Sequence, residues 1–464
     1  MKPGDSSDLT ALFERAAREG ARYRADLPIR PVAPPGLDAE KLRAAFGDTL
    51  GDDPVDPDDV LTELLTAAGP GLVASSGPRF FGLVIGGALP AASAADILTT
   101  GWDQNALNPV ISPAALAAEE RAGIWIKDLL GIPASASAGF VTGGQAANTV
   151  GLAAARHHQL AAAGWDVESD GLAGAPRVRV VAGAERHATI DRALRLLGFG
   201  TAVLEPVAAA ADGSLDPDDL ARVLAAGPDG PLIVCLQAGN VNTGAVDPLR
   251  RSADLVHAHG GWVHVDGAFG LWAGACPSTR PLVDGVELAD SWACDAHKWL
   301  NVPYDSGLAF CAHPEAHAAA VSYTATYLVG SGTATPTGSD FSLESSRRAR
   351  GFAVWAALRE LGRDGVADLV DRACALARRF ASALAEGGAE IANDVVLNQV
   401  LVRFGDDERT DRVVAAVQQE GTCWLGGTTW RGRRHLRISV INHLTTPDDV
   451  DASAAAVLRI AAEM

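Results

Sequence analysis

Lys298 is the residue of this sequence with the clearest capacity for covalent chemistry. It lies in Asp295-Ala-His-Lys-Trp299, among aromatic and small residues. An amine in apolar surroundings tends to lose its proton, and a neutral lysine amine can attack a carbonyl carbon to form a Schiff base. Asp266 ends the apolar run Gly261-Trp-Val-His-Val-Asp266, where a carboxylate could bond a pyridine nitrogen and keep it protonated. The alternative role of Asp266, an N-cap, is disfavoured because Gly-Ala-Phe-Gly at 267–270 is a poor helix start.

Two further segments could bind the remaining parts of such a ligand. Gly143 and Gly144 open an Ala-rich helix, whose N-terminal N–H groups and dipole favour an anion, although such a turn alone is more often only a tight turn. His187 follows the apolar run 178–182, at the strand end where ligands gather in open α/β sheets. Its alternative is a helix-start histidine bonded to the backbone. Lysine, carboxylate, imidazole and anion-binding turn together predict an enzyme that uses pyridoxal 5′-phosphate (PLP).

The motifs resemble, in type and order, those of one enzyme family, the group II PLP-dependent amino acid decarboxylases. The matching motifs are Thr-Gly-Gly-x-x-Ala-Asn (142–148), His187, His-Val-Asp-x-Ala (264–268) and Asp-Ala-His-Lys-Trp (295–299). As a set these motifs are highly specific, whereas each alone is not. The likeness extends from about residue 78 to residue 439, which is most of the chain. It implies the aspartate aminotransferase fold, also called fold type I.

The resemblance implies a role for each matching residue. Lys298 would form the internal aldimine with the cofactor, His187 would stack on its ring, and Asp266 would bond the pyridine nitrogen. The other residues implied around the cofactor, none of them as a metal ligand, are Gly143, Gly144, Gln145, Ala268, Asp295 and His297. Asp295 stands where the family often has Asn or Thr.

The reaction that the resemblance implies is decarboxylation of an L-amino acid to its amine, through an external aldimine and a quinonoid carbanion. Tyr327 or His297 would protonate the carbanion, and the Gly-rich segment 328–340 suits a lid that excludes water. Open alternatives are a lyase, an aldehyde-forming oxidase or an aminotransferase with the same cofactor. A phenylalanine at the loop position tends to mark the aldehyde-forming relatives, so Tyr327 favours decarboxylation. An interaction protein that has lost catalysis is disfavoured by the intact motifs.

Four residues are candidates for contact with the substrate. Phe80 and Phe81 match a stretch that lines the substrate pocket in the family, and Asn240 lies where the family usually has a Thr-rich turn. Arg437 matches an arginine near the substrate in some relatives. A cation on the departing carboxylate would oppose its loss, so a second substrate carboxylate or an orienting contact is favoured. An ion pair between domains fits Arg437 equally well, and both aromatic and acidic substrates fit this set.

Composition narrows the class of protein and its partners. With 464 residues, of which 48% are hydrophobic and 20% charged, the chain is typical of a globular protein with two domains. The net charge of −19 disfavours a nucleic-acid or anionic-membrane partner. Six scattered cysteines and no apolar signal or membrane-spanning run predict a cytoplasmic protein. The resemblance implies a role in amino acid and carboxylic acid metabolism. The resemblance implies a homodimer with its active site at the interface.

The order of helices and strands predicts an α/β fold. Helices at 8–24 and 57–68 would form an N-terminal arm and extension over 1–110. From there, short apolar strands alternate with helices, which predicts a large PLP-binding domain over 111–345 with a mixed, mostly parallel sheet. Residues 346–464 would form a small C-terminal α+β domain.

Overall fold

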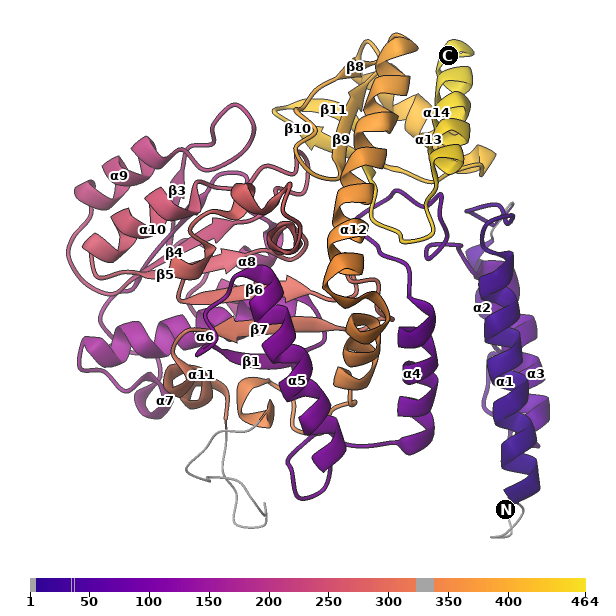
Figure 1. The fold of residues 1–464 in the computed structure, drawn as a ribbon, viewed down its shortest axis with the longest axis horizontal. Helices are drawn as coiled ribbons and strands as arrows, with labels where there is room; N and C mark the ends of the chain where they lie inside the picture. Colours follow the sequence, from indigo (N-terminus) through magenta and orange to yellow (C-terminus); the bar gives the residue numbers. More distant parts are fainter. Residues whose placement is uncertain (1–5, 35, 37, 323–337) are drawn as a thin grey trace.

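The computed structural model describes residues 6–34, 36, 38–322 and 338–464, and a seven-stranded sheet lies at its centre (Figure 1). The strands, in their order across the sheet, are β1 (Ser137–Val141), β7 (Gly307–Cys311), β6 (Ser291–Asp295), β5 (Trp262–Asp266), β4 (Leu232–Gln237), β2 (Arg179–Gly183) and β3 (Leu204–Val207). Strand β7 runs antiparallel to both neighbours, and the remaining pairs are parallel. The predicted α/β fold with a mixed, mostly parallel sheet is confirmed.

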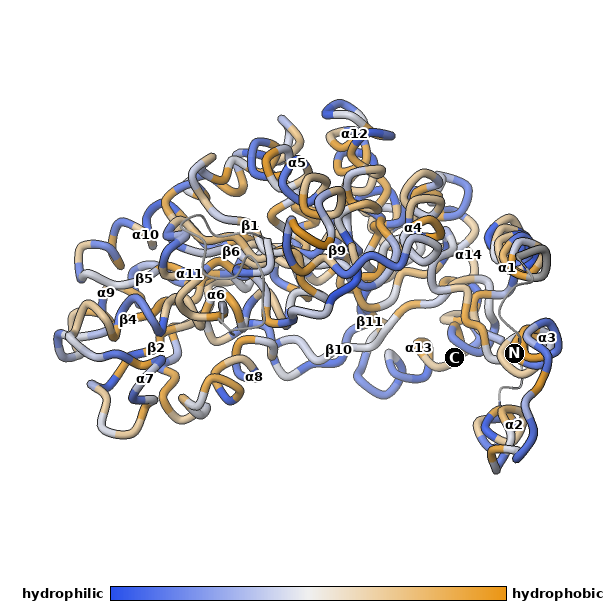
Figure 2. The backbone as a smooth tube through the Cα atoms, turned by 90° about the horizontal axis from the view of Figure 1, so that it is seen from below, coloured by the Kyte–Doolittle hydropathy of each residue, from blue (hydrophilic) through white to orange (hydrophobic). Residues whose placement is uncertain are grey.

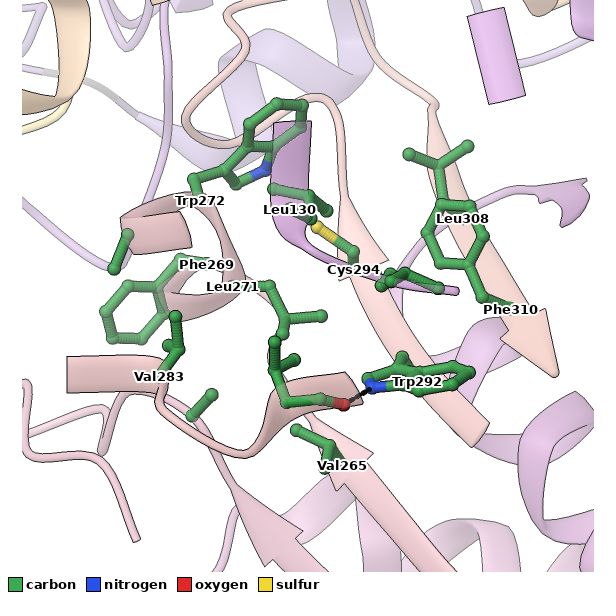
Figure 3. Packing of buried hydrophobic residues seen from close by; sticks show 14 of the residues in the cluster. Leu130, Val265, Phe269, Leu271, Trp272, Val283, Trp292, Cys294, Leu308 and Phe310 are labelled. Carbon is green, nitrogen blue, oxygen red and sulfur yellow. Dashed lines mark hydrogen bonds between the residues drawn. The ribbon is translucent and has the colours of Figure 1, made fainter. Parts of the chain in front are cut away.

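Helices cover both faces of this sheet because successive strand residues point to opposite sides. On β2, Val180 packs with residues of α6 and α8, whereas Val181 belongs to the core cluster that includes residues of α5, α9 and α10. These helices and their neighbours are α5 (Pro113–Leu130), α6 (Gly144–Ala162), α7 (Val167–Asp170), α8 (Ala188–Leu196), α9 (Pro217–Ala226), α10 (Leu249–Ala258) and α11 (Pro314–Val321). Figure 3 shows part of the core cluster to which Val181 belongs. In it, Trp292 of β6 donates its indole N–H to Val286 O at 2.9 Å.

A smaller antiparallel sheet follows toward the C-terminus. Its strands, in spatial order, are β10 (Gly426–Trp430), β11 (Arg433–Ser439), β9 (Gln399–Arg403) and β8 (Glu390–Ile391), with helices α13 (Asp407–Glu420) and α14 (Pro447–Ala462). The long helix α12 (Gly351–Glu386), bent at Gly362, joins the two sheets and contributes to both cores. Because α12 belongs to both cores, a domain boundary at 346 stays a prediction.

The N-terminal helices lie at one end of the molecule (Figures 1 and 2). They are α1 (Ser6–Asp26), α2 (Ala39–Ala45), α3 (Pro57–Ala68) and α4 (Pro90–Trp102), and α4 packs along α12. Short 3-10 turns occur at Gly69–Gly71, Gly270–Ala275, Arg280–Val283, Val286–Leu288 and Gly338–Phe341. None of the helices in the described part of the chain is both long and apolar enough to cross a membrane.

A buried ion pair ties α5 to the segment that precedes α12. Arg347 Nη2 donates to Glu119 Oε2 at 2.7 Å, and the two residues are only 4% and 3% exposed. Burial raises the pKa of the Glu119 carboxyl, and the Arg347 guanidinium opposes that shift. The pair therefore sustains two charges that would be unfavourable alone in this interior.

We predict that Glu119→Gln destabilises the protein strongly, because it leaves the Arg347 guanidinium buried without its counter-ion. The free energy of unfolding, measured by urea denaturation, should fall by about 3–5 kcal/mol. Asp128→Asn is the control, because its ion pair with Arg363 is more than half exposed. That variant should change the free energy of unfolding by less than about 1 kcal/mol. Equal losses in the two variants would contradict the prediction.

Candidate active site

A cavity of about 170 Å³ lies at the carboxyl ends of β4, β5 and β6. The wall includes eight of the residues predicted to bind the cofactor: Gly144, Gln145, His187, Asp266, Ala268, Asp295, His297 and Lys298. Gly143, the ninth, precedes Gly144 as the N-cap of α6. The rest of the wall is Val84, Asn148, Thr189, Gln237, Gly239, Val241 and Phe269. The structure therefore brings together residues that span 214 positions of the sequence, as expected for ligands bound beyond the carboxyl ends of parallel strands.

Lys298 lies three residues beyond β6 and pairs with the last residue of that strand. Its Nζ is 3.0 Å from Asp295 Oδ2, and its side chain is 21% exposed against 3% for Asp295. The other carboxylate oxygen, Asp295 Oδ1, is buried and has no hydrogen-bond partner among the described residues. The lysine amine is thus within the cavity and accessible, and its counter-ion is buried.

Asn301 holds the turn that presents Lys298. Its backbone is left-handed, with φ +52°, a conformation that asparagine tolerates better than most residues. Its side chain is fully buried; Nδ2 donates to Trp299 O at 2.9 Å and to Ile441 O at 3.1 Å. Its Oδ1 accepts from the backbone N–H groups of Gly87 and His443. One amide therefore joins the lysine turn to two other segments of the fold, at Gly87 and at 441–443.

Asp266 is the last residue of β5 and is 5% exposed. Its Oδ2 lies 3.0 Å from Asn148 Nδ2 of α6 and 3.3 Å from Thr189 Oγ1 of α8, and Oδ1 accepts from Ala268 N at 3.3 Å. The N-cap alternative for Asp266 does not apply, because the next helical turn begins only at Gly270. The carboxylate is instead held at the cavity wall with its oxygens available to a donor on a ligand.

His187 is a helix-start residue bonded to the backbone, and it also lines the cavity. It is the N-cap of α8, and its Nδ1 accepts from Thr189 N at 3.3 Å. The same nitrogen lies 2.9 Å from Thr189 Oγ1, so the imidazole is anchored through Nδ1 alone. The ring also lines the cavity, where it is in a position to stack on a flat ligand.

A backbone N–H group determines which ring nitrogen of neutral His297 carries the proton. Its Nδ1 accepts from Ser306 N–H at 3.1 Å, which assigns the ring proton to Nε2 in the neutral form. Nε2 lies 3.6 Å from Asp295 Oδ1. Burial lowers the pKa of His297, against the opposing effect of Asp295, so the neutral form with a proton on Nε2 is the one favoured. His297 can therefore donate a hydrogen bond into the cavity.

The residues present fit PLP. The amine, the ring-nitrogen acceptor and the imidazole share one cavity, and α6 begins at Gly144 beside it. A Cβ at Gly144 would lie 2.9 Å from Asp295 Oδ2, so this helix start has room for no side chain. Such an open N-terminus suits a phosphate. Across the described ranges, no group of three or more His, Cys, Asp or Glu side chains could hold a metal ion.

The substrate candidates lie elsewhere or at the margin. Phe80 stacks on Trp424, and Phe81 packs edge-on against Phe380 in the apolar core beside the four-stranded sheet. Of the same segment, Val84 lines the cavity. Asn240 is fully buried and bonds within its own loop and to the carbonyl of Glu185. Arg437 donates to the carbonyl of Val241, a cavity residue, at 3.2 Å. Tyr327 lies outside the described residues.

Sequence reasoning gave no role to Asn148 and Thr189, which both contact Asp266. Asn148 was visible as the last residue of the Thr-Gly-Gly motif, five positions after Gly143, which places it one helical turn into α6 on the cavity side. Thr189 carried no signal beyond its position two residues after His187.

Comparison with known proteins agrees with this geometry. Residues 40–404 match the model of the pyridoxal-dependent decarboxylase conserved domain. Tryptophan decarboxylase 1 of Oryza sativa subsp. japonica is 28% identical over 100% of this chain and 96% of its own length. L-2,4-diaminobutyrate decarboxylase of Rhizobium meliloti (strain 1021) is 30% identical, over 81% of this chain and 76% of its own.

Among solved structures, Oryza sativa TDC with PLP and tryptamine superposes with a TM-score of 0.93 at 24% sequence identity. The superposition covers 100% of this chain and 99% of that one, which establishes fold type I. A lysine amine, a buried carboxylate and a helix start without side chains in one cavity accord with a family match over most of the chain. The chain belongs to the pyridoxal-dependent decarboxylase family and is a PLP-dependent amino acid decarboxylase.

Proposed function

We propose that Lys298, Asp266 and His187 carry the decarboxylation chemistry, and that the substrate is an aromatic L-amino acid. The observation that carries the first part is the position of Lys298 Nζ, paired with Asp295 in the cavity that also presents Asp266 and His187. Lys298 is the amine that reacts with the cofactor aldehyde and returns when the product leaves.

The surrounding residues bind and orient the cofactor and protonate the reacting carbon. PLP supplies the electron sink for the pair released as carbon dioxide leaves. Asp266 accepts the ring N–H, His187 covers the ring face, and the N–H groups that follow Gly143 bind the phosphate. His297, with its proton on Nε2, donates toward the reacting carbon, and Tyr327, outside the described residues, is the second proton donor of the proposal. Asn301 keeps Lys298 in reach by fixing its turn.

The substrate class rests on the apolar part of the wall. Val84, Val241 and Phe269 line the cavity beside the residues assigned to the cofactor, and they suit an aromatic side chain. Tryptophan decarboxylase 1, which aligns over the whole chain, supports this choice. A second candidate, an acidic amino acid, is favoured by Arg437, since its largely buried guanidinium forms no ion pair among the described residues and reaches a cavity carbonyl.

We also propose a homodimer that works in the cytoplasm. Helices α1 and α3 stand at the end of the molecule and expose apolar side chains: Leu9, Phe13, Val60 and Leu64 are each about half exposed. Exposed apolar surface of this kind is typical of an interface. All six cysteines are buried and unpaired, which fits a reducing compartment.

A panel of L-amino acids tests the reaction and the substrate together. With PLP present, tryptophan, tyrosine and phenylalanine should yield amine and carbon dioxide in equal amounts, with a kcat/KM at least about tenfold above aspartate, glutamate and 2,4-diaminobutyrate. Amine without carbon dioxide would contradict decarboxylation, and aldehyde in place of amine would show the aldehyde-forming alternative. Preference for aspartate or glutamate, lost in Arg437→Leu, would support the second candidate. Lys298→Ala should lose activity and the visible absorption of the bound cofactor.

We predict that Asp295→Asn prefers PLP over pyridoxal about tenfold more strongly than the wild type does. The preference is the ratio of the dissociation constants of the two ligands. The substitution removes a buried negative charge beside the helix start that binds the phosphate in this proposal. Pyridoxal, which lacks the phosphate, is the control, because both ligands gain equally from release of Lys298. Dissociation constants from absorption titrations of the apoprotein give the ratio. An unchanged ratio would show that Asp295 does not face the phosphate.

We predict that the double variant Phe13→Glu, Leu64→Glu weakens the dimer about 100-fold, because it places charges where two apolar side chains would be buried. Sedimentation velocity over a range of protein concentrations measures the dissociation constant. Leu196→Glu, on α8 and 64% exposed, is the control and should leave it unchanged. A wild-type protein that sediments as a monomer would contradict the proposal directly.

A further inference from the structure

Behind Asp266 a chain of hydrogen bonds runs through the interior of the large domain. Trp262 Nε1 donates to Ser291 Oγ at 2.9 Å, and Ser291 Oγ lies 2.8 Å from His264 Nδ1. His264 Nε2 lies 2.9 Å from Asn148 Oδ1, and Asn148 Nδ2 donates to Asp266 Oδ2 at 3.0 Å. Apart from Asp266, every member is at most 1% exposed.

The direction of every bond follows from chemistry at the two ends. An indole N–H only donates, so Ser291 Oγ accepts from Trp262. The Asp266 carboxylate accepts at the other end, so the Asn148 amide must turn Nδ2 toward it and Oδ1 toward His264. His264 Nε2 therefore carries a proton, and in the neutral imidazole Nδ1 accepts from the Ser291 hydroxyl. Burial lowers the pKa of His264 to about 4, which agrees with a neutral imidazole.

The backbone makes room for this arrangement. A Cβ at Gly151, in the middle of α6, would lie 2.7 Å from His264 Cε1. Glycine within a helix costs about 1 kcal/mol relative to alanine, so the helix is less stable than it could be where the imidazole lies against it. A second path of hydrogen bonds connects Asn148 to His187. Asn148 Nδ2 donates to Thr189 Oγ1 at 3.0 Å, and Thr189 Oγ1 lies 2.9 Å from His187 Nδ1.

We propose that His264 is a positioning residue for the cofactor ring. By donating to Asn148 Oδ1 it fixes the orientation of the Asn148 amide, which in turn holds Asp266 with its acceptor oxygens toward the ring nitrogen. The inference rests on the proposed contact between Asp266 and that nitrogen. It extends the site from Asn148 in the cavity wall to three buried residues behind it: His264, Ser291 and Trp262.

The test compares PLP with an analogue whose ring nitrogen is replaced by carbon. The wild-type apoprotein should prefer PLP, and His264→Leu should reduce that preference about tenfold, the loss expected for weakening one hydrogen bond to a charged group. His264→Gln, whose amide can still donate to Asn148 and accept from Ser291, should keep the preference within about threefold. Gly151→Ala should act like His264→Leu, because it displaces the imidazole without removing it.

His317→Leu is the matched control, since His317 is equally buried and bonds a serine, Ser137, with no path to Asp266 among the described hydrogen bonds. It should leave the preference unchanged even if it lowers stability. Nitrogen-15 spectra of histidine-labelled apoprotein should show His264 neutral, with its proton on Nε2, at pH 6 to 8. A protonated ring or a proton on Nδ1 would overturn the inference.

Asp266→Asn distinguishes failure of the positioning role of His264 from failure of the proposed contact between Asp266 and the ring nitrogen. Loss of the preference in Asp266→Asn but not in His264→Leu would overturn the positioning role alone. An unchanged preference in Asp266→Asn would overturn the proposed contact with the ring nitrogen. Equal loss of affinity for both ligands in His264→Leu would mean that His264 acts only on stability.

Discussion

The burial of one carboxylate at the end of a central strand is the constraint on which the site depends. Asp266 can be almost fully enclosed only if donors surround it, and they come from the first turns of two helices, Asn148 of α6 and Thr189 of α8. Those turns must therefore begin at the same edge of the sheet. They bring with them Gly144, which opens α6, and His187, which caps α8. The helix start at Gly144 and the imidazole of His187 are thus brought to the cavity by the same arrangement that satisfies Asp266.

A second carboxylate gives the site an opposing requirement. Asp295 ends β6 and pairs with Lys298 while facing the start of α6, so its charge disfavours an anion nearby. Its other oxygen, Oδ1, lies 3.6 Å from His297 Nε2. A phosphate beside the start of α6 would therefore lie close to a buried negative charge.

Much of this site could be read from the sequence because its main residues follow strands directly. Asp266, His187 and Lys298 each stand at or just after an apolar run, and the carboxyl ends of parallel strands meet at one edge. The strand 262–266 was predicted with its observed limits, and helix 57–68 was too. Strand β10, Gly-Gly-Thr-Thr-Trp, was not, because its pairing with β11 rather than any apolar alternation makes it a strand.

The parts that could not be predicted depend on register and packing. His264 meets Ser291 because β5 and β6 pair them side by side, and it meets Asn148 because α6 crosses that face; the three are far apart in sequence. Phe80 and Phe81 show a different difficulty, because their local pattern fits two environments. Aromatic residues near a site motif are typical of both pocket and core, and only the small domain's packing against Trp424 and Phe380 distinguishes the two.

The side chain of Asn301 has a consequence for the order in which the protein is made. It ties the turn of Lys298 to Ile441 and His443, about 140 residues further along the chain. During synthesis the large sheet can form from residues 137–311 well before those partners leave the ribosome. The reactive lysine therefore reaches its described setting only after the C-terminal sheet has been made. A ribosome-bound chain can have its central sheet complete while the turn of Lys298 still lacks its hydrogen bonds to Ile441 and His443.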